Sequence, residues 1–219
     1  MKLRIYLITL LFIFTTTSSY AFKFSPMSAS IGVKSDNNSS LFYIENDSNQ
    51  PIAIQASLAK REMDINGVEI NAKVGNELSL YPAQLIIPAG EKRSVKVFWT
   101  GNEIPVKEAS YRLIAEQLPI ELEKSKSKKA SIKVLLRYIA ALYVQSENFS
   151  SDVAIKEMKN QGKKIQILVV NSGKKHQVLS NLNLFFTDDK SNKKILFTAE
   201  ELKGMAGENI LADSKRIFS

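Results

Sequence analysis

Histidine, which can act as an acid, a base or a metal ligand, occurs once in this chain, and its sequence neighbours limit which reactions the chain could catalyse. The single histidine is His176, in the loop-like segment NSGKKHQ, and cysteine is absent. One histidine without such partners cannot anchor a typical zinc site, because zinc takes several nitrogen, sulfur or carboxylate ligands. His176 could by count serve as the base of a catalytic triad, but no GxSxG nucleophile elbow accompanies it. The sequence therefore predicts a structural or solvent-exposed histidine and no metal site.

Other residues that could take part in catalysis also lack partners. Asp188 and Asp189 are adjacent, but they lie in the turn-like stretch TDDKSNK, whose composition already explains them. No Gly-rich phosphate-binding loop occurs. These observations predict a protein that is not an enzyme, has no catalytic residues and carries no cofactor.

Positive charge is the other chemical feature of the chain. The sequence has 30 Lys and Arg against 22 Asp and Glu, for a formal net charge of +8. The lysines are spread out, and the densest cluster, KSKSKK at 124–129, interrupts strand-like segments. This pattern favours a solvated loop over a surface for nucleic acid or anionic membrane.

Residues 1–21 have the three parts of a secretory signal peptide. MKLR supplies positive charge, IYLITLLFIF is apolar, and SSYA ends in a small-x-small cleavage pattern. Cleavage before Phe22 would remove Lys2 and Arg4 and lower the formal charge to +6. The apolar run is short for a membrane span, and no other segment is long enough, so we expect export without membrane insertion.

Strand signals dominate the rest of the chain. Segments rich in Val, Ile, Leu and aromatic residues, separated by Gly, Asn, Asp, Ser and Pro, are 40–46, 51–60, 85–90, 94–99, 111–118 and 132–144. In PIAIQASLA and SVKVFW every second residue can face a core. Strands at a spacing of about ten residues predict an all-β fold of antiparallel β-sandwiches.

A polar stretch, QSENFSSD, follows Val144 and suits a hinge between two domains. We therefore predict an N-terminal domain at residues 22–145 and a C-terminal domain at residues 146–219. Strand-like segments in the second part are 164–171, 178–186 and 194–200. Because a sandwich usually takes about 100 residues, we expect the second domain to be incomplete.

The stretch 78–122 resembles the PapD-like periplasmic chaperones of the chaperone–usher pilus pathway. It carries, in that family's order, Pro88, Gly90, Ser94, Val95, Lys96 and Val97, then Glu108, Tyr111, Arg112, Leu118 and Pro119. LLRYIAALYV resembles the strand that closes the first domain in the archaic or alternative short-loop branch, although the proline common after RYxx is Ala140 or Ala141 here. NSGKKHQVLSNLNL and ENILADSKRIF resemble segments of the second domain.

The resemblance implies two immunoglobulin-like domains at an angle with a cleft between them. It also implies a periplasmic function, in which the chaperone completes a pilin subunit that lacks its last strand and delivers it to an outer-membrane usher. The expected partners are pilin subunits and the usher, and the sequence leaves open whether idle copies self-cap as homodimers.

Residues 132–144 are the candidate segment for strand donation. One side carries Ile132, Val134 and Leu136, and the other carries Leu135, Ile139 and Ala141. A strand that is apolar on both faces needs two hydrophobic partners. The first row, nearest the basic loop, is the expected donor row, and the alternative is a strand buried on both faces by its own fold.

In this family, basic residues in the cleft bind the carboxylate at the C-terminus of the client, and a charge-assisted bond of this kind fixes register. Arg137 is the best match, with Lys133 a second candidate if the register slips. The arginine that many members carry on the first strand is Ser28 here, so Lys96 or Arg93 is expected to compensate. For Arg93, solvated surface charge is the favoured alternative.

Arg112 is expected to be structural, since an arginine between Tyr111 and Leu113 in an amphipathic strand usually pairs with a carboxylate or covers apolar surface. A second function remains open as well: a secreted immunoglobulin-like structural or adhesive protein with no client. Fold alone does not separate the two functions.

Overall fold

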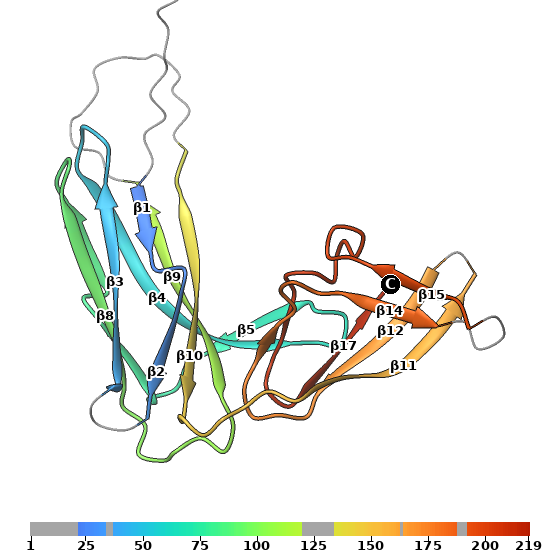
Figure 1. Ribbon diagram of the computed structural model, residues 1–219. Coiled ribbons are helices and arrows are strands. Elements are labelled where there is room, and N and C mark those ends of the chain that lie inside the picture. Colours follow the sequence, from blue (N-terminus) through green and yellow to red (C-terminus); the bar gives the residue numbers. More distant parts are fainter. Residues whose placement is uncertain (1–21, 34–36, 120–133, 163, 188–191) are drawn as a thin grey trace, which may run out of the picture.

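The computed structural model describes residues 22–33, 37–119, 134–162, 164–187 and 192–219, and these residues form strands without an α-helix. The strands build two immunoglobulin-like β-sandwich domains, each around its own hydrophobic core, and the domains meet at an angle (Figure 1). The predicted fold class is confirmed. No helix within the described ranges is long and apolar enough to cross a membrane. The predicted signal peptide and the basic loop at 124–129 lie outside the described residues.

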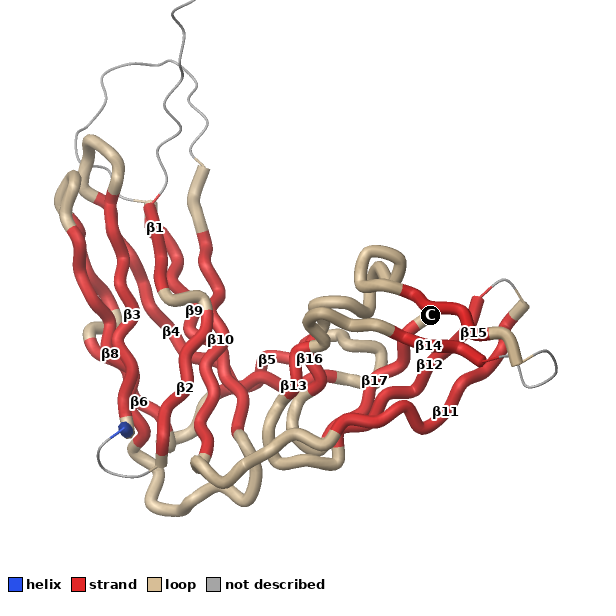
Figure 2. The backbone as a smooth tube through the Cα atoms, in the orientation of Figure 1, coloured by secondary structure: helices blue, strands red, loops and turns tan. Residues whose placement is uncertain are grey.

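The first domain consists of two facing sheets (Figure 2). Its strands are β1 (Phe22–Ser25), β2 (Ser28–Gly32), β3 (Ser39–Asn46), β4 (Ile52–Met63), β5 (Glu69–Lys73), β6 (Leu78–Tyr81), β7 (Gln84–Ile87), β8 (Lys92–Trp99), β9 (Ala109–Leu118) and β10 (Arg137–Gln145). One sheet has the order β1-β3-β8-β6, and the other has the order β2-β10-β9-β4-β5 with β7 on β4. We call the second one the six-stranded sheet.

Alternation of apolar and polar side chains explains why these strands pack as two layers. In β8, Val95 and Val97 are fully buried, while Lys96 between them is exposed. In β3, Phe42 and Ile44 are buried beside them. Burial of one side chain of this size contributes roughly 1.5–3 kcal/mol, so alternate residues fix which face of the strand points inward.

The chain passes from one sheet to the other between its first two strands. β1 pairs antiparallel with β3, and after Pro26 and Met27 the chain continues as β2, which pairs parallel with β10. The parallel pairing begins where Ser28 lies opposite Ala141. As a result, β2 covers only the C-terminal half of β10.

The second domain is smaller. It contains β11 (Val153–Gln161), β12 (Lys164–Asn171), β13 (Gln177–Val178), β14 (Leu184–Thr187), β15 (Lys194–Phe197), β16 (Asn209–Ile210) and β17 (Ser214–Phe218). The sheets are β11-β12-β17, β13-β16 and β14-β15. Its core is formed by Ile167, Val169, Leu179, Met205, Ile210 and Phe218.

A buried asparagine ends a strand in each domain and holds the adjoining loops. The Asn46 amide donates to the carbonyl oxygens of Gln50, Ile87 and Pro88 at 2.8–3.0 Å. The Asn171 amide donates to the carbonyl oxygens of Lys175, Ile210 and Leu211 at 2.7–3.3 Å. Because buried backbone carbonyls need partners, these two side chains replace strand pairing where the strands end.

One predicted strand is wrong. The segment 178–186 is not a single strand, because Ser180 and Asn181 form a turn between β13 and β14. Asn181 has φ of 53°, a left-handed conformation that asparagine tolerates better than most residues. Its polar side chain thus indicates a turn, where the apolar pattern around it predicted a strand.

Candidate functional site: an open strand edge and the domain junction

The N-terminal half of β10 presents an open edge. Residues 137–140 pair with β9 on one side, and among the described residues no strand pairs with them on the other. The pairing with β9 extends one residue further, because the Gln117 amide donates to the Leu136 carbonyl at 2.9 Å. An edge of this kind exposes backbone donors and acceptors that can take up another strand.

Apolar side chains accompany this edge. Val134 is 74% exposed, and Leu135 and Ile139 are also exposed. Leu136 packs against the first core, as does Tyr138, whose ring lies 4.8 Å from that of Phe22. The segment before β10 therefore joins the core of the domain to an uncovered apolar surface.

The candidate donor and carboxylate-binding residues lie in different surroundings. Val134 is exposed, Leu136 is partly buried, and Ile132 and Lys133 lie outside the described residues. Arg137 is exposed at the start of β10 and lies opposite Glu116 of β9. Their roles in client binding stay predictions.

Arg137 and Lys96 do not come together. Arg137 has the same parity in β10 as Tyr143, whose side chain contacts the second domain, so Arg137 lies on the outer face of the six-stranded sheet. Lys96 lies between two buried valines of β8, so it faces outward from the opposite sheet. One carboxylate group could not contact both side chains in this arrangement. Arg93 is exposed and forms an ion pair with its neighbour Glu91.

Arg112 has the structural role that its strand position predicted. It donates from Nε and Nη2 to the two carboxylate oxygens of Glu69, both at 2.6 Å. Arg61 donates from Nε to Glu69 Oε2 at 3.1 Å and is only 8% exposed. The Arg112 hydrogen bonds, and the charges of Arg61 and Arg112, hold the pKa of the Glu69 carboxyl below its ordinary value of 4.5 against the opposing effect of burial.

Sequence reasoning did not find Arg61 or Glu69. They are eight residues apart on β4 and β5, and Arg112 on β9 is 43 residues from Glu69. Only the strand registers bring the three charges together, since Ala59 lies opposite both Arg112 and Lys73. The Asn66–Gly67 dipeptide in AKREMDINGVEINAK was a signal that could have indicated a paired hairpin.

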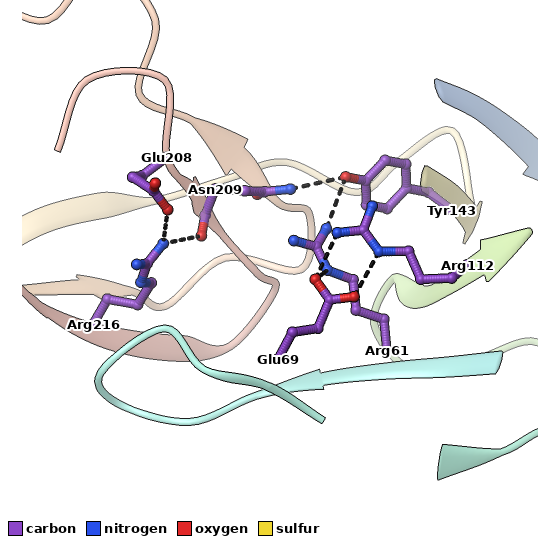
Figure 3. Close-up of polar contacts among 7 residues, drawn as sticks. All are labelled: Arg61, Glu69, Arg112, Tyr143, Glu208, Asn209 and Arg216. Carbon is purple, nitrogen blue, oxygen red and sulfur yellow. Dashed lines mark hydrogen bonds and ion pairs between the residues drawn. The ribbon is translucent and has the colours of Figure 1, made fainter. Parts of the chain in front are cut away.

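The outer face of β10, on which Arg137 lies, also carries the junction with the second domain (Figure 3). The Tyr143 hydroxyl accepts a hydrogen bond from Asn209 Nδ2 at 2.8 Å and from Arg61 Nη1 at 3.4 Å. The Tyr143 ring stacks on His176, with 3.8 Å between ring centroids and 10° between ring planes. Polar and aromatic contacts from both domains therefore meet at this tyrosine.

His176 is structural. Its Nδ1 lies 2.7 Å from Oε1 of the buried Glu108, and its backbone amide donates to the same oxygen at 3.2 Å. Lys107, next to Glu108, forms an ion pair with Asp213 of the second domain at 2.8 Å. The histidine thus contributes to domain packing.

No group of three or more His, Cys, Asp or Glu side chains that could hold a metal ion occurs in the part of the chain that the structure describes. Asp188 and Asp189 lie outside it. The described residues bring together an open strand edge, an exposed apolar surface and a charged junction between the domains. Together they define an all-β protein of two angled sandwiches with an open strand edge.

The family follows from comparison with known proteins. Residues 24–148 match the model for pili and flagellar-assembly chaperones, PapD N-terminal domain, and this match covers more than half of the chain. The chain belongs to this family, and the resemblance inferred from residues 78–122 is confirmed. A search of curated proteins found no match.

Solved structures of pilus chaperones share the fold. One is the CsuC–CsuE chaperone–tip adhesion subunit complex from archaic Csu pili of Acinetobacter baumannii, with 19% identity, a TM-score of 0.65, and coverage of 91% of this chain and 87% of that chain. The class 5 fimbriae chaperone CfaA has 20% identity, a TM-score of 0.62, and coverage of 89% and 84%. The SafB chaperone with SafA pilin of Salmonella enterica has 12% identity, a TM-score of 0.59, and coverage of 92% and 85%. At these identities the likeness shows the fold.

Proposed function

We propose that this protein is a periplasmic chaperone that binds pilin subunits by donating a strand and delivers them to an outer-membrane usher. The family and the fold establish the broader class of pilus assembly chaperone. The finer proposal adds the mechanism, the compartment and the two partners. It depends on the open edge of β10.

The open edge carries this proposal because it supplies both parts of a strand-pairing interaction. Residues 137–140 have unpaired backbone groups on one side, and Val134 and Leu135 next to them expose apolar side chains. Main-chain hydrogen bonds give affinity in strand addition, and side chains that enter pockets give specificity. A pilin that lacks one strand would have unpaired backbone groups and an open apolar groove, which a donated strand could fill.

Two solved structures support the choice of client. The CsuC chaperone was solved with a tip adhesion subunit, and the SafB chaperone with a pilin. The expected donor row is Ile132, Val134 and Leu136, and Leu136 packs against the first core. A client strand beside this row would extend that core.

Substitution of Val134 tests strand donation. Val134→Asp places a charge where the client groove would be apolar, and we expect loss of co-purification with an exported pilin encoded beside the chaperone gene. The matched control is Val106→Asp, because Val106 is 81% exposed in the loop before β9, away from the edge. Burial of an unpaired carboxylate is costly, whereas an exposed one is not.

Both variants should unfold thermally like the parent protein, since neither side chain is buried. Undiminished pilin binding by the Val134 variant would contradict strand donation at this segment. If the parent protein binds no exported subunit encoded beside its gene, the alternative is favoured. That alternative is an immunoglobulin-like structural or adhesive protein without a client.

Arg137 is the proposed anchor for the C-terminal carboxylate of the client, with Lys133 beside it in the sequence as a second candidate. Arg137→Glu should weaken pilin binding about tenfold or more, because a charge-assisted hydrogen bond becomes a repulsion. Lys96→Glu is the control, since it makes the same charge reversal on the opposite face of the domain. Titration calorimetry with the purified pilin would measure both. Equal losses for the two variants would refute the assignment to Arg137.

Delivery to the usher is the second step of the proposal. A chaperone–pilin complex should bind membranes that contain the usher encoded beside it, and the free chaperone should bind them more weakly. Equal binding in the presence and absence of pilin would argue against delivery as a client-dependent step.

A further inference from the structure

The hairpin formed by β4 and β5 extends from the first domain to the second (Figure 1). β4 is 12 residues long and pairs with β9 only as far as Lys60, which lies opposite Tyr111. Residues 61–63 of β4 pair with β5 alone. The end of the hairpin is therefore outside the sandwich to which it belongs.

The tip of this hairpin is ordered by its own hydrogen bonds. The Asp64 carboxylate accepts hydrogen bonds from the backbone amides of Asn66 at 2.9 Å and Val68 at 2.8 Å. The Gly67 amide donates to the Asp64 carbonyl at 3.0 Å. An aspartate that bonds to the backbone two and four residues ahead holds a tight turn in one conformation.

This tip occupies the edge of a strand in the second domain. The Ile217 amide of β17 donates to the Ile65 carbonyl at 2.8 Å. β17 is the last strand of the β11-β12-β17 sheet and pairs with β12 on its other side. The hairpin thus supplies a hydrogen-bond acceptor at an edge of β17 with which no strand of the described residues pairs.

Gly67 allows the close approach of the two domains. Its φ is +85°, and a Cβ atom at this position would overlap the guanidinium group of Arg216. Arg216 is 6% exposed, and its Nη1 contacts Glu208 Oε2 at 2.5 Å and the Asn209 carbonyl at 3.3 Å. The arginine therefore has little room to move away from the hairpin.

The base of the hairpin is fixed as well. Glu69 at the start of β5 binds Arg61 of β4 and Arg112 of β9, and Arg61 also contacts the Tyr143 hydroxyl (Figure 3). Tyr143 in turn accepts from Asn209 of the second domain. The tip therefore contacts the second domain directly, and the base is linked to it through Tyr143 and Asn209.

We infer that the β4–β5 hairpin is an interdomain clamp that holds the second domain at one angle to the first. A direct contact at the tip, together with the link from the base through Tyr143, restricts rotation, whereas a single contact would leave a pivot. The connection between β10 and β11 supplies a covalent link, Glu108 and Lys107 contact His176 and Asp213 of the second domain, and the clamp adds a further bridge. This inference does not depend on the client or on the proposed function.

Gly67→Ala tests the clamp, with Gly204→Ala as the matched control. Both glycines have φ of +85°, so alanine causes the same backbone strain at both positions. A Cβ atom at Gly204 would meet no atom within 4 Å, whereas one at Gly67 would meet Arg216. A difference between the variants therefore reports on the contact between the hairpin and the second domain.

The distance between the domains can be measured by double electron–electron resonance. The chain has no cysteine, so spin labels on Ser94→Cys and Lys156→Cys, both exposed and one in each domain, are the only ones introduced. We expect one narrow distance peak for the parent protein and for Gly204→Ala, and loss of that peak for Gly67→Ala. Far-UV circular dichroism confirms that both variants retain their strands.

An unchanged narrow peak in Gly67→Ala would overturn the clamp, and so would equal broadening in both glycine variants. Tyr143→Phe provides a second test that does not introduce backbone strain, because it removes only the hydroxyl that Asn209 and Arg61 contact. Where Gly67→Ala does not fold, a broadened peak for Tyr143→Phe supports the clamp, and a parent-like peak rejects it.

Discussion

Glu69 is the residue on which the charged junction depends, because one carboxylate satisfies two arginines that are largely removed from solvent. Arg112 binds it in a bidentate manner and Arg61 binds it through Nε. A planar guanidinium matches a carboxylate in this geometry better than an ammonium does. The pair of arginines therefore would not be equivalent to a pair of lysines.

Glu69→Gln should lower the free energy of unfolding by about 1–3 kcal/mol, since it leaves two guanidinium groups without their counter-charge in a partly buried place. Chemical denaturation of the parent protein and the variant would measure the difference. Glu62→Gln is the control, because Glu62 is exposed and its ion pair with Lys60 lies at the surface. A loss of the same size in the control would contradict the special role of Glu69.

The contribution of Glu69 should also depend on pH. Because its pKa is lower in the folded protein than its ordinary value of 4.5, ionised Glu69 stabilises the fold fully above pH 4.5. This stabilisation is lost as the pH falls through the folded pKa. The stability difference between the parent protein and Glu69→Gln should therefore shrink below pH 4.5. A difference that stays constant to lower pH would show that the carboxylate charge is not its cause.

Among the elements, β10 combines two roles along its length. Its N-terminal half has an open edge, and its C-terminal half lies between β2 and β9 and carries Tyr143 to the domain junction. The division occurs where β2 begins to pair, at Ala141. A strand held firmly at one end and open at the other can present backbone groups without the cost of ordering them at the moment of binding.

Alternation of buried and exposed residues predicted β12, whereas the largely exposed strand β11 was missed. β12 was predicted with its observed bounds, 164–171, since Ile167, Val169 and Asn171 alternate with more exposed residues. β11 was missed, because VAIKEMKNQ is exposed along most of its length and has no apolar period to detect. The pattern that marks a strand comes from burial, so an exposed strand lacks it.

The candidate site was only partly predictable for a related reason. The parity of Arg137 and Lys96 within their strands can be read from the sequence, but the sheet to which each strand belongs cannot. The Arg61–Glu69–Arg112 cluster depends on two strand registers at once, which local sequence does not specify. Arg112 was assigned correctly as structural because its own strand position was sufficient evidence.

At the scale of the whole molecule, two separate cores imply that each domain can be perturbed by itself. Phe42 is fully buried in the first core, and its ring stacks at 5.8 Å on that of Phe24. Phe42→Ala should lower the stability of the first domain by about 3–5 kcal/mol through lost burial and a cavity. Trp99 packs against the same core and is the single tryptophan in the chain, so its fluorescence reports this unfolding step.

Phe218→Ala is the comparison, because Phe218 lies in the second core. Its effect on the Trp99 transition should be smaller than that of Phe42→Ala. Equal shifts in the two variants would show that the two cores unfold as one cooperative unit, contrary to the expectation from their separation.

The stacking of His176 on Tyr143 makes the junction visible to proton NMR without any label. A chain with one histidine gives one set of imidazole ring signals. The ring current of Tyr143, whose ring centroid lies 3.8 Å from that of His176, displaces these signals from their positions in a free histidine. Separation of the domains would return these signals toward the free positions. One resolved pair of resonances can therefore follow the opening of the junction in solution, under the same conditions in which a client is added.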